Sequence, residues 1–165
     1  MTRAQDAPSE HAERTAVMPD SLRGSVIVGV DGSPASLEAI RMGHRLAGAL
    51  GLPLSAIHIW HPSSPLRVPP SWHPHDDAMT MLAHSVRVAF EPEPAPDVQL
   101  FVERGDAASS LIECSDGAAM LVVGRKATRS GLGGALMGSV SSACAAHARC
   151  PVLVVQQPGD ADGSA

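Results

Sequence analysis

The chain has very few aromatic side chains, since its 165 residues include two Phe, two Trp and no Tyr. Proteins that bind single-stranded nucleic acid stack bases on aromatic rings, and few such rings are available here. The net charge of −5 also has the wrong sign for a surface that binds a phosphate backbone. The small number of aromatic rings and the negative net charge predict that neither DNA nor RNA is the main partner.

Long apolar runs and closely spaced cysteine pairs are also missing. No apolar stretch approaches the ~20 residues of a membrane-spanning helix, and residues 1–23 lack the apolar core of a secretory signal. The cysteines Cys114, Cys144 and Cys150 lie in apolar segments and form no Cys-x-x-Cys motif. We therefore expect no membrane association, reduced thiols and a cytoplasmic protein.

The familiar catalytic motifs are absent as well. Lys126 is the single lysine, and the sequence contains no Gly-x-x-x-x-Gly-Lys-Ser/Thr, no Gly-x-Ser-x-Gly and no His-Glu-x-x-His. His61, His73 and His75 lie in a Pro/His-rich segment, 61–75, but their spacing does not match that of a four-ligand structural zinc site. The sequence therefore predicts no catalytic residues and no metal site, and we interpret 61–75 as a flexible loop.

What the sequence does contain is an alternation of short apolar runs with helix-like segments. Strands are predicted at 25–31, 54–60, 97–103, 119–123 and 151–155. Helices are predicted at 34–50, 76–90, 105–116 and 138–147. This alternation predicts an α/β fold, a single doubly wound sheet of five parallel strands with helices on both faces. The folded domain is expected at 24–157, between disordered tails at 1–23 and 158–165.

Ligands of such sheets bind at the carboxyl ends of the strands, which here are marked by Asp31 and Gly124. The segment 124–139 contains five glycines and three cations, and it leads into the last predicted helix. Glycines allow a close approach of the backbone, and the amides of a helix N-terminus attract anions. The segment therefore favours a phosphate-binding loop; the alternative is a flexible surface connection with solvated cations.

Several short motifs of the sequence, taken together, resemble the universal stress protein family over roughly residues 24–156. The motifs are Val-Ile-Val-Gly-Val-Asp-Gly-Ser-Pro at 26–34, Glu-Arg-Gly-Asp-Ala at 103–107, Leu-Val-Val-Gly at 121–124, Gly-Ser-Val at 138–140 and Cys-Pro-Val-Leu-Val-Val at 150–155. The resemblance implies the strand order 3-2-1-4-5 of the adenine nucleotide alpha hydrolase-like fold. It also implies ATP binding, which many members perform through Gly-x-x-Gly, nine residues and then Gly-Ser or Gly-Thr.

This sequence departs from the family's glycine pattern at one point. Gly124 matches the first glycine, and Gly138 and Ser139 match the terminal pair. The middle glycine is replaced by Ala127 or Thr128, depending on the end from which one counts, because the loop is one residue longer than the pattern. A β-carbon there restricts the backbone or approaches the phosphates.

The resemblance implies a set of nucleotide-binding residues at the ends of the first and fourth strands. They are Gly29, Val30, Asp31, Ile57, Val123, Gly124, Lys126, Thr128, Arg129, Gly138, Ser139 and Val140. A carboxylate repels a polyphosphate, so Asp31 is expected at the adenine or ribose end unless Mg²⁺ mediates the contact. Asp31 could instead serve only the turn before the first helix, and Ile57 only the core.

The resulting hypothesis is a cytoplasmic nucleotide sensor of the stress response that binds ATP, with or without Mg²⁺, and has at most slow hydrolysis. The apolar fifth strand should lie at a sheet edge, where pairing with a second copy would cover it and make a homodimer. One alternative is a dimeric interaction module that binds no nucleotide. Another is a slow ATPase.

Overall fold

The computed structural model describes residues 20–61, 73–125 and 138–157. The strands within these residues are β1 (Val26–Gly29), β2 (Leu54–Trp60), β3 (Gln99–Arg104), β4 (Met120–Gly124) and β5 (Val152–Val155). The helices are α1 (Pro34–Leu50), α2 (Pro74–Phe90), α3 (Ala107–Cys114) and α4 (Ser139–His147), preceded by the short 3-10 helix η1 (Asp20–Leu22). Strands and helices therefore alternate along the chain as predicted.

The strands form one parallel sheet in the order β3-β2-β1-β4-β5. β1 lies at the centre. From β1 the chain adds β2 and β3 on one side, and then β4 and β5 on the other. Sheets of this kind bind ligands where the side changes, which here is at the carboxyl ends of β1 and β4. The predicted fold class and strand order are both confirmed.

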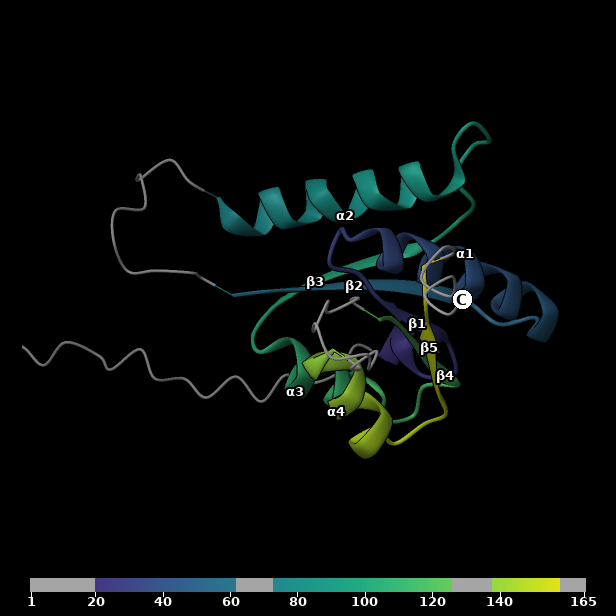
Figure 1. Cartoon of the computed structure of the whole chain (residues 1–165). Helices are drawn as coiled ribbons and strands as arrows, with labels where there is room; N and C mark the ends of the chain where they lie inside the picture. Colours follow the sequence, from purple (N-terminus) through teal and green to yellow (C-terminus); the bar gives the residue numbers. More distant parts are fainter. Residues whose placement is uncertain (1–19, 62–72, 126–137, 158–165) are drawn as a thin grey trace, which may run out of the picture.

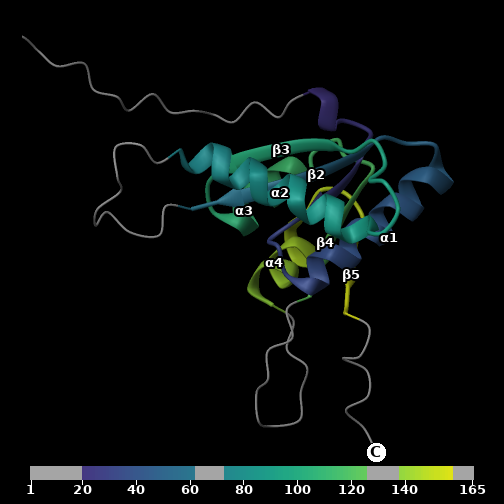
Figure 2. The same ribbon diagram turned by 90° about the horizontal axis from the view of Figure 1, so that it is seen from above.

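Helices cover both faces of the sheet (Figure 1). The long helices α1 and α2 lie together on one face, and the shorter α3 and α4 lie together on the other. Figure 2 shows α1 and α2 from above, with the strands behind them. Two apolar clusters fill the space between the layers. One contains Val28, Ile40 and Leu82 on the α1/α2 face, and the other contains Ile27 and Leu121 on the α3/α4 face.

Local sequence signals set the ends of α1. Ser33 caps its first turn by accepting a hydrogen bond from the backbone N–H of Ser36, and Pro34 occupies the first helical position. At the other end Gly51 adopts the left-handed conformation with φ of 64°, which other residues rarely adopt. The first turn of α1, which adjoins the end of β1, therefore begins at a fixed position.

Two expected boundaries are wrong. Residues 20–22 form η1, and Leu22 is only 1% exposed within the α3/α4 cluster, so the expected tail 1–23 is too long at its C-terminal end. The expected loop 61–75 is also too long, because α2 already begins at Pro74, with His73 as its N-cap. Proline suits the first position of a helix because it has no N–H to satisfy there. Residues 1–19, 62–72 and 158–165 lie outside the described residues.

Across the described ranges, no helix is both long and apolar enough to cross a membrane.

Candidate functional site

A cavity of about 210 Å³ opens at the carboxyl ends of β1 and β4, on the α3/α4 side of the sheet. Its walls come from β1, β2 and β4 and from the first turns of α1, α3 and α4. The lining residues are Gly29, Val30, Asp31, Ser36, Ile57, Ile59, Ala107, Leu111, Val123, Gly124, Gly138, Ser139, Val140 and Ser141. The cavity therefore lies at the carboxyl strand ends where the sequence predicted ligand binding.

Most of the residues predicted for the site meet around this cavity. They are Gly29, Val30, Asp31, Ile57, Val123, Gly124, Gly138, Ser139 and Val140. The other three, Lys126, Thr128 and Arg129, lie outside the described residues. The structure therefore brings together residues more than 100 positions apart in the sequence.

The cavity also contains residues that the sequence did not single out. These are Ser36, Ile59, Ala107, Leu111 and Ser141. Ser36 is in the first turn of α1 and Ala107 opens α3, so each follows a strand end by a short connection. The rule that ligands bind at carboxyl strand ends could have suggested these two, whereas Leu111 requires knowledge of how α3 packs.

The inner wall of the cavity is apolar. Ile57, Leu111 and Val123 are all buried and belong to the core cluster on the α3/α4 face, and Ile59 packs against the same cluster. The core interpretation of Ile57 is therefore correct for its side chain, which also lines the cavity. An apolar wall of this kind suits a flat, weakly polar ring.

The end of β1 is held by hydrogen bonds to β2. The backbone N–H of Val30 donates to the carbonyl of Ile57 at 2.8 Å, and Nδ1 of His58 lies 2.7 Å from the carbonyl oxygen of Val30. Asp31 then accepts hydrogen bonds at Oδ1 from the backbone N–H of Ser33, at 3.0 Å, and from the Ser33 hydroxyl. The Asp31 carboxylate therefore serves the turn and borders the cavity as well.

The opposite wall is the start of α4. Gly138 is the N-cap and, being glycine, has no side chain of its own to cap this helix end by a hydrogen bond. The carbonyl of Gly138 accepts from the Ser141 hydroxyl at 3.0 Å and from the backbone N–H of Ser142 at 2.9 Å. The first N–H groups of a helix have no partner within the helix and carry partial positive charge. This wall can therefore receive an anion.

An added β-carbon would be too close to its neighbours at two glycines of the site, and at Gly124 these neighbours are backbone atoms, which cannot rotate away. A β-carbon on Gly124 would lie 2.7 to 2.8 Å from backbone atoms of Ala35 and Ser36 at the start of α1. A β-carbon on Gly29 would lie 2.9 Å from a methyl of Leu111. The glycine at position 124 thus lets α1 approach the end of β4 closely.

The N-terminus of α3 carries a carboxylate beside the cavity. Oδ2 of Asp106 accepts hydrogen bonds from the backbone N–H and the hydroxyl of Ser109, at 3.0 and 2.9 Å, and these bonds lower the pKa of Asp106.

Glu103 lies on β3, where it is paired in register with Ile59 of β2. Burial raises the pKa of Glu103, and the negative charge of Glu113 raises it further. Among the described residues, no three His, Cys, Asp or Glu side chains lie together so that they could hold a metal ion.

A sequence model described as the universal stress protein family matches residues 23–156. The chain belongs to the universal stress protein family. It is 35% identical to a universal stress protein of Mycobacterium tuberculosis over 144 residues, which are 86% of this chain and 48% of that protein. A second relative, from Mycolicibacterium smegmatis, is 37% identical over 134 residues, or 79% of this chain and 45% of the relative.

This universal stress protein chain thus spans about half the length of the curated relatives it matches. Solved structures of the family agree with its fold. The crystal structure of a universal stress protein in complex with cAMP is 25% identical, with a TM-score of 0.59. That match covers 82% of this chain and 98% of the solved chain.

Proposed function

We propose that this universal stress protein binds an adenine nucleotide in the cavity at the ends of β1 and β4. The observation that carries the proposal is the pairing of an apolar wall with a helix N-terminus across a single hollow. A nucleotide has a flat base at one end and negative charge at the other, so it needs both features. The related protein that was solved with cAMP supports this choice of ligand.

The arrangement of the walls gives the nucleotide a direction. The base would lie against Ile57 and Val123, and the phosphates would lie at the first amides of α4, beside Ser139. Asp31 follows β1 and lines the same cavity, and because its negative charge repels phosphate it would face the ribose. The cavity of about 210 Å³ is below the ~300 Å³ at which ligand pockets usually begin, so it would enclose only part of a nucleotide.

ATP, with or without Mg²⁺, is the nucleotide we propose, and sensing rather than turnover is the proposed role in a cytoplasmic stress response. The three cations that follow Gly124 in the sequence, Arg125, Lys126 and Arg129, would balance part of a triphosphate's charge. Among the described residues that border the cavity there is one carboxylate and no histidine or cysteine, which leaves little for general acid and base chemistry. Slow hydrolysis remains the alternative activity to be measured.

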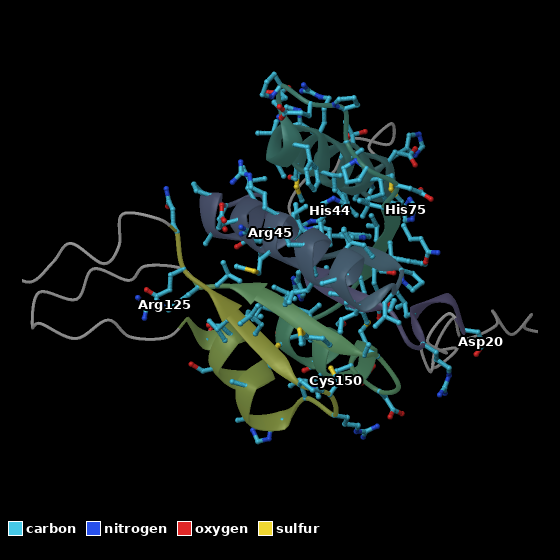
Figure 3. The ribbon with its side chains drawn as sticks, turned by 90° about the vertical axis from the view of Figure 1, so that its right-hand side faces the viewer. Asp20, His44, Arg45, His75, Arg125 and Cys150 are labelled. Atoms are coloured by element: carbon cyan, nitrogen blue, oxygen red, sulfur yellow. The ribbon has the colours of Figure 1, made fainter. Side chains whose placement is uncertain are left out.

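A homodimer through β5 belongs to the same proposal. β5 is an outer strand of the sheet, next to β4 alone. Figure 3 shows it along the edge, with Arg125 and Cys150 near its two ends. Its residues are apolar, and Val152, Leu153 and Val154 are only partly buried. Pairing of this edge with a second copy would satisfy its backbone and cover these side chains.

Nucleotide binding is tested by calorimetric titration of the purified chain with ATP, AMP and cAMP, using GTP as the control for base preference. Gly138→Asp is the informative variant. The backbone of Gly138, with φ of −60° and ψ of 154°, accommodates an N-cap aspartate, which would keep α4 stable while placing a negative charge where the phosphates should lie. We expect at least tenfold weaker binding of ATP with an unchanged melting temperature.

Gly138→Asn is the matched control, because asparagine caps a helix equally well without the charge. It should bind ATP more tightly than Gly138→Asp does. Equal affinities of the two variants would place the phosphates elsewhere. If the wild-type chain binds no adenine nucleotide at millimolar concentration, the result would favour the interaction module that binds no nucleotide. The observation that supports this alternative is the missing middle glycine of the loop. Phosphate release measured in the same samples tests the slow ATPase.

A further inference from the structure

His58 lies on β2 between two residues that line the cavity, and its side chain is on the opposite face of the sheet. Side chains alternate along a strand, so His58 shares a face with Ala56 of the α1/α2 cluster, whereas Ile57 and Ile59 line the cavity. Its Nδ1 lies 2.7 Å from the carbonyl oxygen of Val30. His58 therefore contacts the backbone of the cavity wall without entering the cavity.

This contact complements the backbone bond at the same residue. The β1–β2 ladder ends in register at Gly29 opposite Ile57, and one further bond runs from Val30 N to the Ile57 carbonyl. Both backbone groups of Val30 are thus tied to consecutive residues of β2. The Val30 carbonyl belongs to the peptide group that links Val30 to Asp31. The Asp31 carboxylate accepts hydrogen bonds from Ser33, which orient it.

We propose that His58 is a positioning residue for the nucleotide site, acting through the Val30 carbonyl to fix the peptide that presents Asp31. The inference rests on the proposed function of the cavity. A carbonyl oxygen can only accept a hydrogen bond, so Nδ1 of His58 carries a proton. An asparagine side chain can place an N–H donor close to the position of Nδ1, whereas leucine of similar size cannot donate.

The experiment compares wild type, His58→Leu and His58→Asn by calorimetric titration with ATP. Loss of one typical hydrogen bond corresponds to roughly fivefold in an equilibrium constant, so His58→Leu should bind ATP about five- to tenfold more weakly. His58→Asn should restore affinity to within about twofold of wild type. Nitrogen NMR of labelled histidine should show the Nδ1–H tautomer at His58. His44→Leu, on an exposed position of α1, controls for the removal of any imidazole.

Equal ATP affinity of His58→Leu and wild type would overturn the inference, and so would a His58→Asn variant as weak as His58→Leu. A wild-type chain that binds no nucleotide would instead remove the proposed function. In that case the backbone amide resonances of Val30 and Asp31 decide whether His58 positions this peptide. Displacement in His58→Leu that His58→Asn reverses would support the positioning role, and unchanged resonances would refute it. If His58→Leu does not fold, the other two measurements decide the question. An Nδ1–H tautomer in wild type and near-wild-type affinity of His58→Asn would support the inference, and the absence of either would contradict it.

Discussion

Gly124, at the carboxyl end of β4, lies against the backbone of Ala35 in the first turn of α1. A β-carbon built on Gly124 would stand 2.8 Å from the carbonyl oxygen of Ala35 and 2.7 Å from its carbonyl carbon. Backbone atoms cannot rotate away as a side chain can, so the two elements can approach this closely only without a side chain at 124. The same approach brings Ser36 and Gly124 to one cavity.

We therefore predict that Gly124→Ala destabilises the protein even in the absence of ligand. Forcing a methyl group into a filled space costs about 1–3 kcal/mol in the free energy of unfolding, measured by denaturant titration. Gly48→Ala is the control, since a β-carbon there meets nothing within 4 Å and the position is inside α1. That variant should be more stable than wild type by about 0.5–1 kcal/mol. Unaltered stability of Gly124→Ala would show that α1 can shift freely.

Ser139 offers a test that leaves the fold intact. It is the first residue of α4, it is exposed, and it borders the cavity. Ser139→Ala should weaken ATP binding by roughly 1 kcal/mol, the value of one net hydrogen bond, and by more if the acceptor is charged. Calorimetry measures the change. Ser142→Ala, one turn along the same helix and outside the cavity lining, should bind ATP like wild type; a similar loss in both variants would point to a general effect on α4.

Much of the site was predictable because a parallel sheet fixes where strand ends meet. Once β1 and β4 are identified as apolar runs, the topology alone brings Asp31 and Gly124 to one edge. The reason for the glycine at 124 was not predictable, since the contact with Ala35 exists only after α1 packs. The sequence suggested a phosphate cradle there, and the structure adds a packing requirement.

The boundaries that failed have physical causes of the same kind. Leu22 belongs to a segment with no strand or helix pattern in the sequence, and it is held by burial against the α3/α4 cluster and by hydrogen bonds from Ser25 to its carbonyl. Pro74 looked like part of a proline-rich loop, although proline is equally suited to the first turn of a helix. Short local patterns are ambiguous at such points, and tertiary contacts decide them.

Asp106 predicts a pH dependence of stability. Its hydrogen bonds from Ser109 lower its pKa in the folded protein, so the deprotonated form favours folding. This contribution is complete above the ordinary pKa of aspartic acid, about 3.9, and is lost as the pH falls through the lower folded value. The stability gap between wild type and Asp106→Ala should therefore be widest near pH 7 and close progressively below about pH 4.

The matched variant for this experiment is Asp106→Asn, which keeps an N-cap acceptor but cannot titrate. Its stability relative to Asp106→Ala should not change with pH in the acid range. Urea titrations at a series of pH values measure all three proteins. A wild-type advantage over Asp106→Ala that persists undiminished into strong acid would contradict the assignment.

The edge strand β5 permits a test of the proposed dimer that leaves its bonds to β4 in place. The backbone N–H of Leu121 donates to the Pro151 carbonyl, and that of Arg125 donates to the Val155 carbonyl. Alternate residues of a parallel strand face the same neighbour, so positions 151, 153 and 155 face β4 and Val154 directs its backbone N–H to the free edge. Val154→Pro removes that N–H and no donor to β4, and natural edge strands use proline in this way to prevent pairing.

We expect Val154→Pro to sediment as a monomer at concentrations where wild type is a dimer, because β5 would lose a donor at the centre of the pairing edge. Val154→Ala keeps the N–H and should remain dimeric, which separates the hydrogen bond from the loss of side-chain volume. Circular dichroism confirms that both variants are folded. A Val154→Pro variant that dimerises as tightly as wild type would assign the interface to another surface, whereas a monomeric wild type would remove the dimer from the proposal and leave nucleotide binding to be judged by calorimetry.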